Sequence, residues 1–383
     1  MRTASPLRIG VPLLLCGLLV TVLMWRELGG EGVAAGLLLA LVPVPFLLGA
    51  FRWLDSVAPA PWRPLAFAFG WGACAATLFA LVVGGALIGL VSGDFGGDAT
   101  SLRPAHADAL ELTVIAPVVE ESAKAAAVLL LFVHRPRAFN GLLAGLVAAG
   151  VTATGFAFTE NVLYLGSAFT QDHAAAPSVL LGAGTLVTFV VRVLIAPFAH
   201  PVFTALTGIG FGLAATLPPE RGRALRVGLP LAGLAAAMGL HSAWNASASM
   251  TVTGFVLVYL LLMFPVFCGL CWLAARARRV QLRVVREVLP LYAAAGWLTP
   301  DEPEALASPE HRSRARELAR RMHGQAGRRA VADYQRAATS LALLRERAER
   351  GVEGPEFRAE ERELLARIER HRSVAVPVTL SSG

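Results

Sequence analysis

Long apolar segments constrain this chain more than any other feature of its sequence. An α-helix needs about 20 predominantly apolar residues to cross the hydrocarbon core of a bilayer. Eight segments approach or exceed that length, and they run Ile9–Trp25, Val33–Phe51, Pro64–Val91, Leu110–Val133, Phe139–Leu163, Val179–Leu217, Val227–Ala248 and Val252–Ala275. The sequence therefore predicts an all-α polytopic membrane protein with about eight transmembrane helices.

Charge is scarce in these segments and concentrated behind them. Only 16% of the 383 residues are charged, whereas soluble domains carry about 25%. Residues 276–383 hold 21 arginines against 15 acidic residues, at helical spacing, and no nucleic-acid-binding motif. We expect a basic helical cytoplasmic tail here, whose first part, Arg276–Leu289, suits an anionic lipid surface. We predict three domains. Residues 1–108 form a three-helix membrane region, residues 109–275 form a catalytic membrane core, and residues 276–383 form the tail.

Positive charges in the connections predict the orientation. Taken alternately, one set of connections holds Arg26 and Arg103. The other set holds Arg2, Arg8, Arg52, Arg63, Arg135, Arg137, Arg221, Arg223, Arg226 and the arginine-rich tail. Because cytoplasmic loops carry the excess of Lys and Arg, we expect a multi-pass protein of the cell membrane with both termini in the cytoplasm.

The sixth segment, Val179–Leu217, is anomalous in length. At 1.5 Å per residue it would be roughly twice as long as the hydrocarbon core is thick. It contains Arg192 and Pro197, and a proline inside a helix removes one backbone hydrogen bond. A tilted or broken helix is expected, with a re-entrant segment as the alternative.

Polar side chains cluster in four consecutive apolar segments. An ionisable residue in the bilayer costs about 2.5–3.5 kcal/mol on insertion scales and usually serves a function. These segments hold Glu120, Glu121, Lys124, Glu160, Asn161, Arg192, His200, His241 and Asn245. Four neighbouring helices with this content are expected to surround one site.

The fourth segment carries two adjacent carboxylates and the chain's single lysine. Glu120 and Lys124 are spaced i,i+4 and share a helix face, whereas Glu121 is rotated by about 100°. Lys124 would then neutralise one carboxylate and leave the other free to act as a base. The alternative is an ion pair that only holds helices together.

The later polar residues have alternatives of their own. Glu160 is predicted near the outer end of its helix, where it could be an interfacial carboxylate. His200 could simply form a hydrogen bond within the helix bundle. His241 and Asn245 share one helix face at i,i+4. Glu120 lies about 15 Å and His241 about 10 Å from the outer ends of their helices, which places the site between the midplane and the outer surface.

Carboxylates, histidines and an amide in this setting suit activation of water. A glutamate would remove the proton, and a histidine or Asn245 would donate to the developing oxyanion. A zinc version would use Glu160, His200 and His241 as ligands, with the base from Glu120 or Glu121. A metal-free version needs only glutamate, histidine and amide around a water. A proton-coupled transporter or a non-catalytic scaffold are the other classes that buried Glu, Lys and His allow.

Several of these residues also form a familiar series. Glu120-Glu121-x-x-Lys124, Phe156-x-x-x-Glu160-Asn161, His200 and His241 resemble the PrsW family of intramembrane proteases. His241-x-x-x-Asn245 is similar to an element of the related CAAX prenyl protease and bacteriocin-processing group. The resemblance covers roughly residues 110–248.

The resemblance implies cleavage of a membrane-anchored protein within the bilayer, typically an anti-sigma factor. It also implies catalytic roles for Glu120, Glu121 and His200. Glu160 and His241 would support them or bind metal, and Lys124, Asn161 and Asn245 would be supporting residues.

Overall fold

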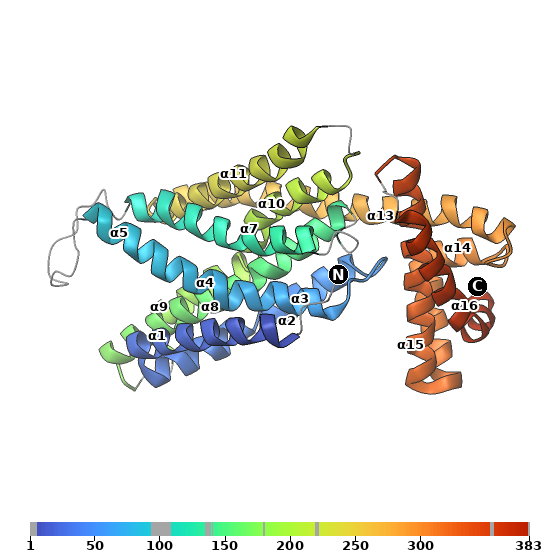
Figure 1. Ribbon diagram of the computed structural model, residues 1–383. Coiled ribbons are helices and arrows are strands. Elements are labelled where there is room, and N and C mark those ends of the chain that lie inside the picture. The colour runs from blue at the N-terminus through green and yellow to red at the C-terminus, as the bar shows by residue number, and fades with distance from the viewer. Residues whose placement is uncertain are drawn as a thin grey trace. The chain divides into compact units, whose positions relative to one another are not determined.

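The computed structural model describes residues 6–92, 109–134, 139, 141–178, 181–218, 222–352 and 356–381, without the side chains of residues 6–9 and 92. Arg2, Arg103, Arg135, Arg137 and Arg221, which entered the orientation argument, lie outside this part, as does Val179. The described residues are helical and include no strand (Figure 1). The predicted all-α class of polytopic membrane protein is confirmed.

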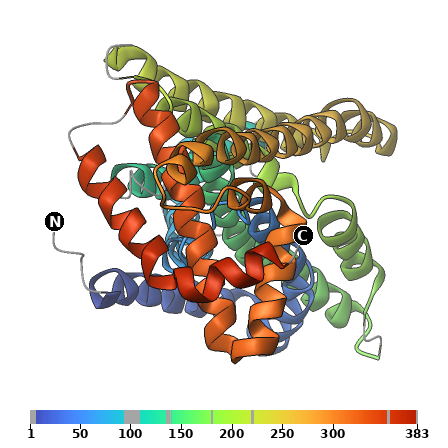
Figure 2. The same ribbon diagram turned by 90° about the vertical axis from the view of Figure 1, so that its right-hand side faces the viewer.

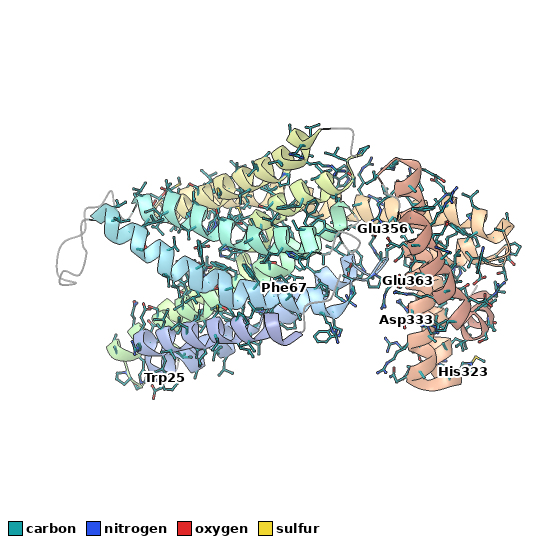
Figure 3. All side chains as sticks on the ribbon, viewed as in Figure 1. Trp25, Phe67, His323, Asp333, Glu356 and Glu363 are labelled. Carbon is teal, nitrogen blue, oxygen red and sulfur yellow. The ribbon has the colours of Figure 1, made fainter. Side chains whose placement is uncertain are left out.

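The chain divides into two compact units. Residues Met1–Trp53, Pro61–Ala215 and Val227–Cys271 form the membrane unit, and Leu54–Ala60, Thr216–Arg226 and Trp272–Gly383 form the C-terminal unit. The predicted division of the membrane part at residue 108 stays a prediction. Trp25 is exposed on the surface of the membrane unit, whereas exposed Asp333 and Glu363 mark the charged surface of the C-terminal unit (Figure 3).

Within the part of the chain that the structure describes, six helical stretches are long and apolar enough to cross a membrane. They are Gly10–Leu54, Trp62–Val91, Leu142–Ala175, Ala183–Ala215, Arg223–Ser247 and Val252–Ala294. Helix α7 (Ala116–His134), preceded by the wide turn η3 (Glu111–Ile115), differs because it carries Glu120, Glu121 and Lys124. The predicted count of eight stays a prediction.

The first stretch consists of α1 (Pro6–Leu41) and α2 (Val44–Leu54), and α1 has a sharp break in its interior. Gly29 has φ +68°, a conformation that glycine adopts without steric cost. After this break the chain runs antiparallel to α8 (Leu142–Ala175), because Gly32 lies against Thr170 and Phe51 lies against Gly150.

The part of α1 before Gly29 runs in the opposite direction. Leu13 lies near Gly70 and Cys74 near Gly17, so this arm is parallel to the helix formed by α3 (Trp62–Gly70) and η1 (Trp71–Ala76). That helix is itself parallel to α8, because Phe69 meets Gly155 and Thr159 donates to the Ala73 carbonyl. The two arms of α1 therefore form a hairpin. The third predicted span continues through α4 (Thr77–Phe79), η2 (Ala80–Gly84) and α5 (Gly85–Ser92).

Helix α8 is the central element of the membrane unit. It contacts α1, α3, η1, α7 and α10 (Ala199–Ala215), and more than half of its residues are buried. A Cβ atom at Gly145 would lie 2.0 Å from the Gly208 carbonyl oxygen, so glycine permits the close approach of α8 and α10. The helix continues to Ala175, beyond the predicted end at Leu163, which leaves Glu160 well inside it rather than at its outer end.

The sixth predicted span is broken, as expected. Helix α9 (Ala183–Phe189) continues into the wide π-helical turn η4 (Val190–Ile195), and α10 starts at Ala199. Ala196 leaves the helical region at φ −127° and ψ 42°, since Pro197 disfavours an α conformation in the residue before it. The proline break therefore separates Arg192 on η4 from His200 in the first turn of α10.

Two more helical stretches complete the membrane unit. The first is α11 (Arg223–Ser247), most of which belongs to this unit. The second comprises α12 (Val252–Val258), η6 (Tyr259–Met263) and the start of α13 (Phe264–Ala294). The hydroxyl of Thr251 caps α12 by accepting from the Gly254 amide at 3.2 Å.

The C-terminal unit contains α14 (Glu302–Ala307), α15 (Pro309–Glu349) and α16 (Phe357–Leu380) (Figure 2). Gly324 interrupts α15 with φ +64°, and the later arm returns so that Gln335 donates to the Arg312 carbonyl at 3.0 Å. A core of Val, Leu, Ala and Tyr side chains lies between these helices and the end of α13. The unit is a helical domain with its own hydrophobic core.

Candidate active site

Lys124 lies at the centre of a polar cluster inside the membrane unit. Its side chain is 0% exposed. The ammonium nitrogen lies 2.8 Å from Glu121 Oε1, 3.2 Å from Glu120 Oε2 and 3.0 Å from His200 Nδ1. Since an ammonium group has three donors and no acceptor, these three partners match its capacity. The ring of Phe156 closes another side, with its centroid 3.9 Å from the nitrogen.

Glu121 organises the cluster from within. It is fully buried and accepts from Lys124, from Thr204 Oγ1 at 2.8 Å and from His241 Nδ1 at 3.1 Å. Both carboxylate oxygens are therefore engaged. Glu120 differs, because it lines a cavity and its side chain is 13% exposed.

The partners of the two histidines define their tautomers. Lys124 can only donate, so His200 Nδ1 accepts and Nε2 carries the proton, which faces Glu160 Oε2 at 2.5 Å. His241 Nδ1 faces the carboxylate of Glu121, so Nδ1 carries the proton and Nε2 keeps its lone pair. That lone pair lies 3.9 Å from Glu120 Oε2.

Aromatic packing fixes both imidazole rings. The His200 and His241 rings lie edge to face with centroids 5.2 Å apart, and Phe203 stacks on His241 at 4.7 Å. Phe156 packs against His200 at 5.5 Å. Such contacts restrict ring rotation and maintain the directions of the lone pairs.

Glu160 joins the two arms of the broken span. Its Oε2 atom lies 2.7 Å from Arg192 Nη2 on η4 and 2.5 Å from His200 Nε2 on α10. Arg192 Nε also donates to Asn161 Oδ1 at 2.8 Å, and its guanidinium lies over the Tyr164 ring at 3.9 Å. Glu160 is thus paired with groups on both sides of the proline break.

A cavity of about 700 Å³ opens from the cluster. Glu120, Glu160, Arg192 and His200 line its polar part. Its apolar wall comes from α4, η2, α5, η3, α8, α11 and α12, with small residues such as Gly84. The polar cluster is thus open to a space large enough for a short peptide segment.

Comparison with known families decides the class of this site. A family model described as PrsW family intramembrane metalloprotease matches residues 60–270, more than half of the chain. The chain belongs to the PrsW family. It is therefore an intramembrane protease, a multi-pass membrane enzyme that acts in a lipid environment. Searches of curated proteins and of solved structures found no match.

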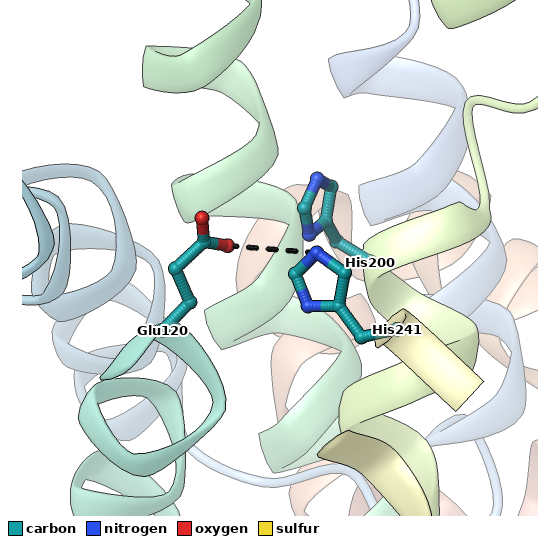
Figure 4. A group of neighbouring side chains, drawn as sticks. All are labelled: Glu120, His200 and His241. Atoms are coloured by element: carbon teal, nitrogen blue, oxygen red, sulfur yellow. Dashed lines mark ion pairs between the residues drawn. The ribbon is translucent and has the colours of Figure 1, made fainter. Parts of the chain in front are cut away.

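The PrsW family is a metalloprotease family, and this member has a group of side-chain donor atoms that could hold a metal ion. Glu120 on α7, His200 on α10 and His241 on α11 each offer one atom, and these atoms lie within 4.8 Å of one another (Figure 4). In each histidine the nitrogen that faces away from the group lies against a carboxylate, which is the usual support of a metal-bound histidine. The His241 Nε2 lone pair faces the group unused, whereas the His200 Nδ1 lone pair accepts from Lys124 at 3.0 Å. The donor types are those of a zinc site, and a metal ion would have to displace the ammonium from His200 and Glu120.

The ligand set predicted for this PrsW family member included Glu160 rather than Glu120. In the structure Glu160 lies behind His200, where it contacts the nitrogen that faces away from the three gathered donor atoms. The geometry favours Glu120 as the third ligand. The Lys124 ammonium already binds Glu120 and His200 in this group, so it supplies a positive charge next to the same donor atoms.

The remaining predicted site residues of this PrsW family member lie at the edge of the cluster. Asn245 lines the cavity, but its amide donates to the Leu112 carbonyl at 2.9 Å. Asn161 is buried and accepts from Arg192. Two contacts of the cluster were not predicted, Thr204 to Glu121 and Arg192 to Glu160. An arginine inside an apolar segment was the available signal for the second, whereas an intramembrane threonine gives none.

Proposed function

We propose that this PrsW family member hydrolyses a peptide bond of a membrane-anchored protein within the cavity, with Glu120 facing the attacking water. The observation that carries this proposal is the difference between the two adjacent carboxylates. Glu121 has both oxygens engaged inside the cluster, whereas Glu120 lines the cavity. Glu120 is therefore the carboxylate of the pair that a water molecule can reach.

The residues divide the work of hydrolysis. The Glu120 carboxylate accepts a proton from the water as its oxygen attacks the carbonyl carbon, and it returns that proton to the amine as the C–N bond breaks. Lys124 and Glu121 hold Glu120 and the histidines in place. In the metal-assisted alternative, a zinc ion held by Glu120, His200 and His241 would act as a Lewis acid and lower the pKa of the water, with Glu120 as a ligand rather than as the base.

The position of the cavity supports cleavage near the extracytoplasmic side. Glu27 and Glu111 also line the cavity, and both belong to helix ends that the orientation argument places outside. Glu120 follows Glu111 by nine residues of helix, about 14 Å. A single-span anti-sigma factor, cut in its outer half, is the substrate class that the family resemblance predicts.

The C-terminal unit supports an orientation with both termini in the cytoplasm of the cell. It combines residues 272–383 with the connections 54–60 and 216–226, all of which positive-charge counting assigns to the cytoplasm. Arg312 Nη2 donates to the Val57 carbonyl at 2.9 Å and Arg278 Nη2 to Ser56 Oγ at 3.1 Å. Segments that contact one another in this way lie on the same side of a membrane.

The test is cleavage of a single-span reporter by the purified protein in proteoliposomes. Wild type should cut the reporter in the outer half of its span, and His200→Ala and His241→Ala should not, at matched amounts of folded protein. Equal cleavage by these variants would contradict the proposed site. The transporter alternative is not favoured, because the chain belongs to an enzyme family.

A further inference from the structure

Arg192 is the cation that faces the cavity. Among the described residues that line the cavity it is the only arginine or lysine. Four glutamates line the same cavity, Glu27, Glu111, Glu120 and Glu160. Its side chain is 23% exposed. A charge at this depth is costly, so its retention in the wall of the cavity calls for a chemical reason.

The guanidinium of Arg192 is held firmly but only partly used. Of its five N–H donors, Nε–H goes to Asn161 and one is taken up by the ion pair in which Nη2 lies 2.7 Å from Glu160 Oε2, while Tyr164 supports the flat face of the group. The other three N–H groups have no acceptor among the residues that the structure describes. None of these donors is a buried atom without a partner, so they are accessible to a molecule in the cavity that Arg192 lines.

The free donors lie beside the histidine of the cluster. Arg192 and His200 contact the same atom, Glu160 Oε2, at 2.7 and 2.5 Å. A peptide that enters the cavity and approaches Glu120 and His200 therefore passes within reach of the guanidinium. Asn245, the residue predicted to stabilise the oxyanion, has its amide engaged by the Leu112 carbonyl instead.

We infer that Arg192 is a catalytic residue that donates hydrogen bonds to the carbonyl oxygen of the scissile peptide bond. This inference rests on the proposed function. When water attacks the carbonyl carbon, the C=O π electrons move to the oxygen, and the guanidinium stabilises the resulting negative charge. The oxygen re-forms the double bond as the C–N bond breaks and the amine leaves with the proton that Glu120 received.

Chemical rescue separates this role from a structural one. Arg192→Ala should lower kcat by about 10²–10³-fold, the usual effect of removing one oxyanion donor, with a much smaller change in KM. Millimolar guanidinium ion should restore cleavage by Arg192→Ala by about tenfold or more, since the ion can occupy the space left by the side chain. The same ion should not restore His200→Ala, and Arg223→Ala, at an exposed position, should behave as wild type.

The outcomes distinguish this inference from the proposed function. Wild type that cuts the reporter while Arg192→Ala cuts it within about twofold would overturn the role of Arg192 alone. Folded Arg192→Ala whose lost rate guanidinium does not restore would also overturn it and indicate a positioning role through Glu160. Wild type that leaves every reporter intact would overturn both.

Discussion

Both units of the molecule bury charged side chains, but they use them differently. In the C-terminal unit Glu302 is fully buried, and its carboxylate accepts from the Thr299 amide at 2.7 Å, from the Thr299 hydroxyl and from the Tyr334 hydroxyl. Arg312, 4% exposed, donates to Thr339 and to the Val57 carbonyl. In the membrane unit Glu121 and Lys124 are buried to the same degree.

The difference lies in which donors and acceptors stay available. The buried carboxylate of Glu302 is surrounded by hydrogen-bond donors within the core of its unit. In the membrane unit Glu120, the inner lone pair of His241 and the free donors of Arg192 remain close to a cavity. Burial of charge is therefore a poor mark of a catalytic site, and unused polar groups that face a cavity are a better one.

The largest expected effect contrasts the two units directly. Glu120→Gln should lower the cleavage rate by about 10²–10⁴-fold, because a neutral amide cannot accept the proton of water. Glu302→Gln, an equivalent change at a buried carboxylate of the C-terminal unit, should leave the rate per folded molecule nearly unchanged. Initial rates of reporter cleavage, normalised to folded protein, measure both, and equal loss in the two variants would remove the distinction.

Lys124→Met should reduce stability strongly. Removing one member of a buried ion pair leaves an uncompensated charge and costs about 3–5 kcal/mol, and here two carboxylates and a histidine lose their partner. The matched control is Arg320→Met, whose ion pair with Glu317 is exposed and should contribute less than about 1 kcal/mol. Unfolding in mixed detergent micelles measures both, and a Lys124→Met protein as stable as the control would contradict the central role of the ammonium.

Metal affinity tests which glutamate belongs to the donor group. Glu160→Gln should weaken zinc binding by about 10–100-fold, the usual effect of losing a residue that orients a ligand. Glu120→Ala and His241→Ala should weaken it further, because they remove donor atoms. Competition with a chelating dye gives the affinities. A larger loss in Glu160→Ala than in Glu120→Ala would favour the ligand set predicted from the sequence.

The smallest expected effect concerns pH and the C-terminal unit. Burial and then the hydrogen bond to Glu302 raise the pKa of Tyr334 above its ordinary value. The unfolded phenol ionises near pH 10, so the stabilisation is complete below that pH and declines as pH rises further. Tyr334→Phe should cost about 1.5–3 kcal/mol at pH 8 and less at pH 11.

Urea unfolding followed by helical circular dichroism at the two pH values provides the measurement. Burial lowers the pKa of Arg312 to about 10. Above pH 10 this arginine loses its proton more readily in the folded than in the unfolded state, so its effect on stability rises with pH, opposite to that of Tyr334. The difference between wild type and Tyr334→Phe is therefore the quantity to compare. A difference that does not change between pH 8 and pH 11 would contradict the Tyr334–Glu302 interaction.

The sequence by itself determined the class of the protein and predicted most of the residues that form the polar cluster. Apolar length identified a multi-span helical protein, since a bilayer leaves the backbone few other ways to satisfy its hydrogen bonds. The cost of intramembrane charge identified Glu120, Glu121, Lys124, His200 and His241, and the structure brings them together. The proline in the sixth span predicted the break before His200 for a local steric reason.

Only the tertiary structure decided what each of these residues faces. Helical periodicity fixes which residues share a face, but it does not fix the rotation of one helix against another. The contacts that Glu121 makes and Glu120 does not, to Thr204 and to His241 Nδ1, join residues 83 and 120 positions apart. The end of α8 and the position of Glu160 behind His200 likewise depend on packing between helices, which local sequence does not encode.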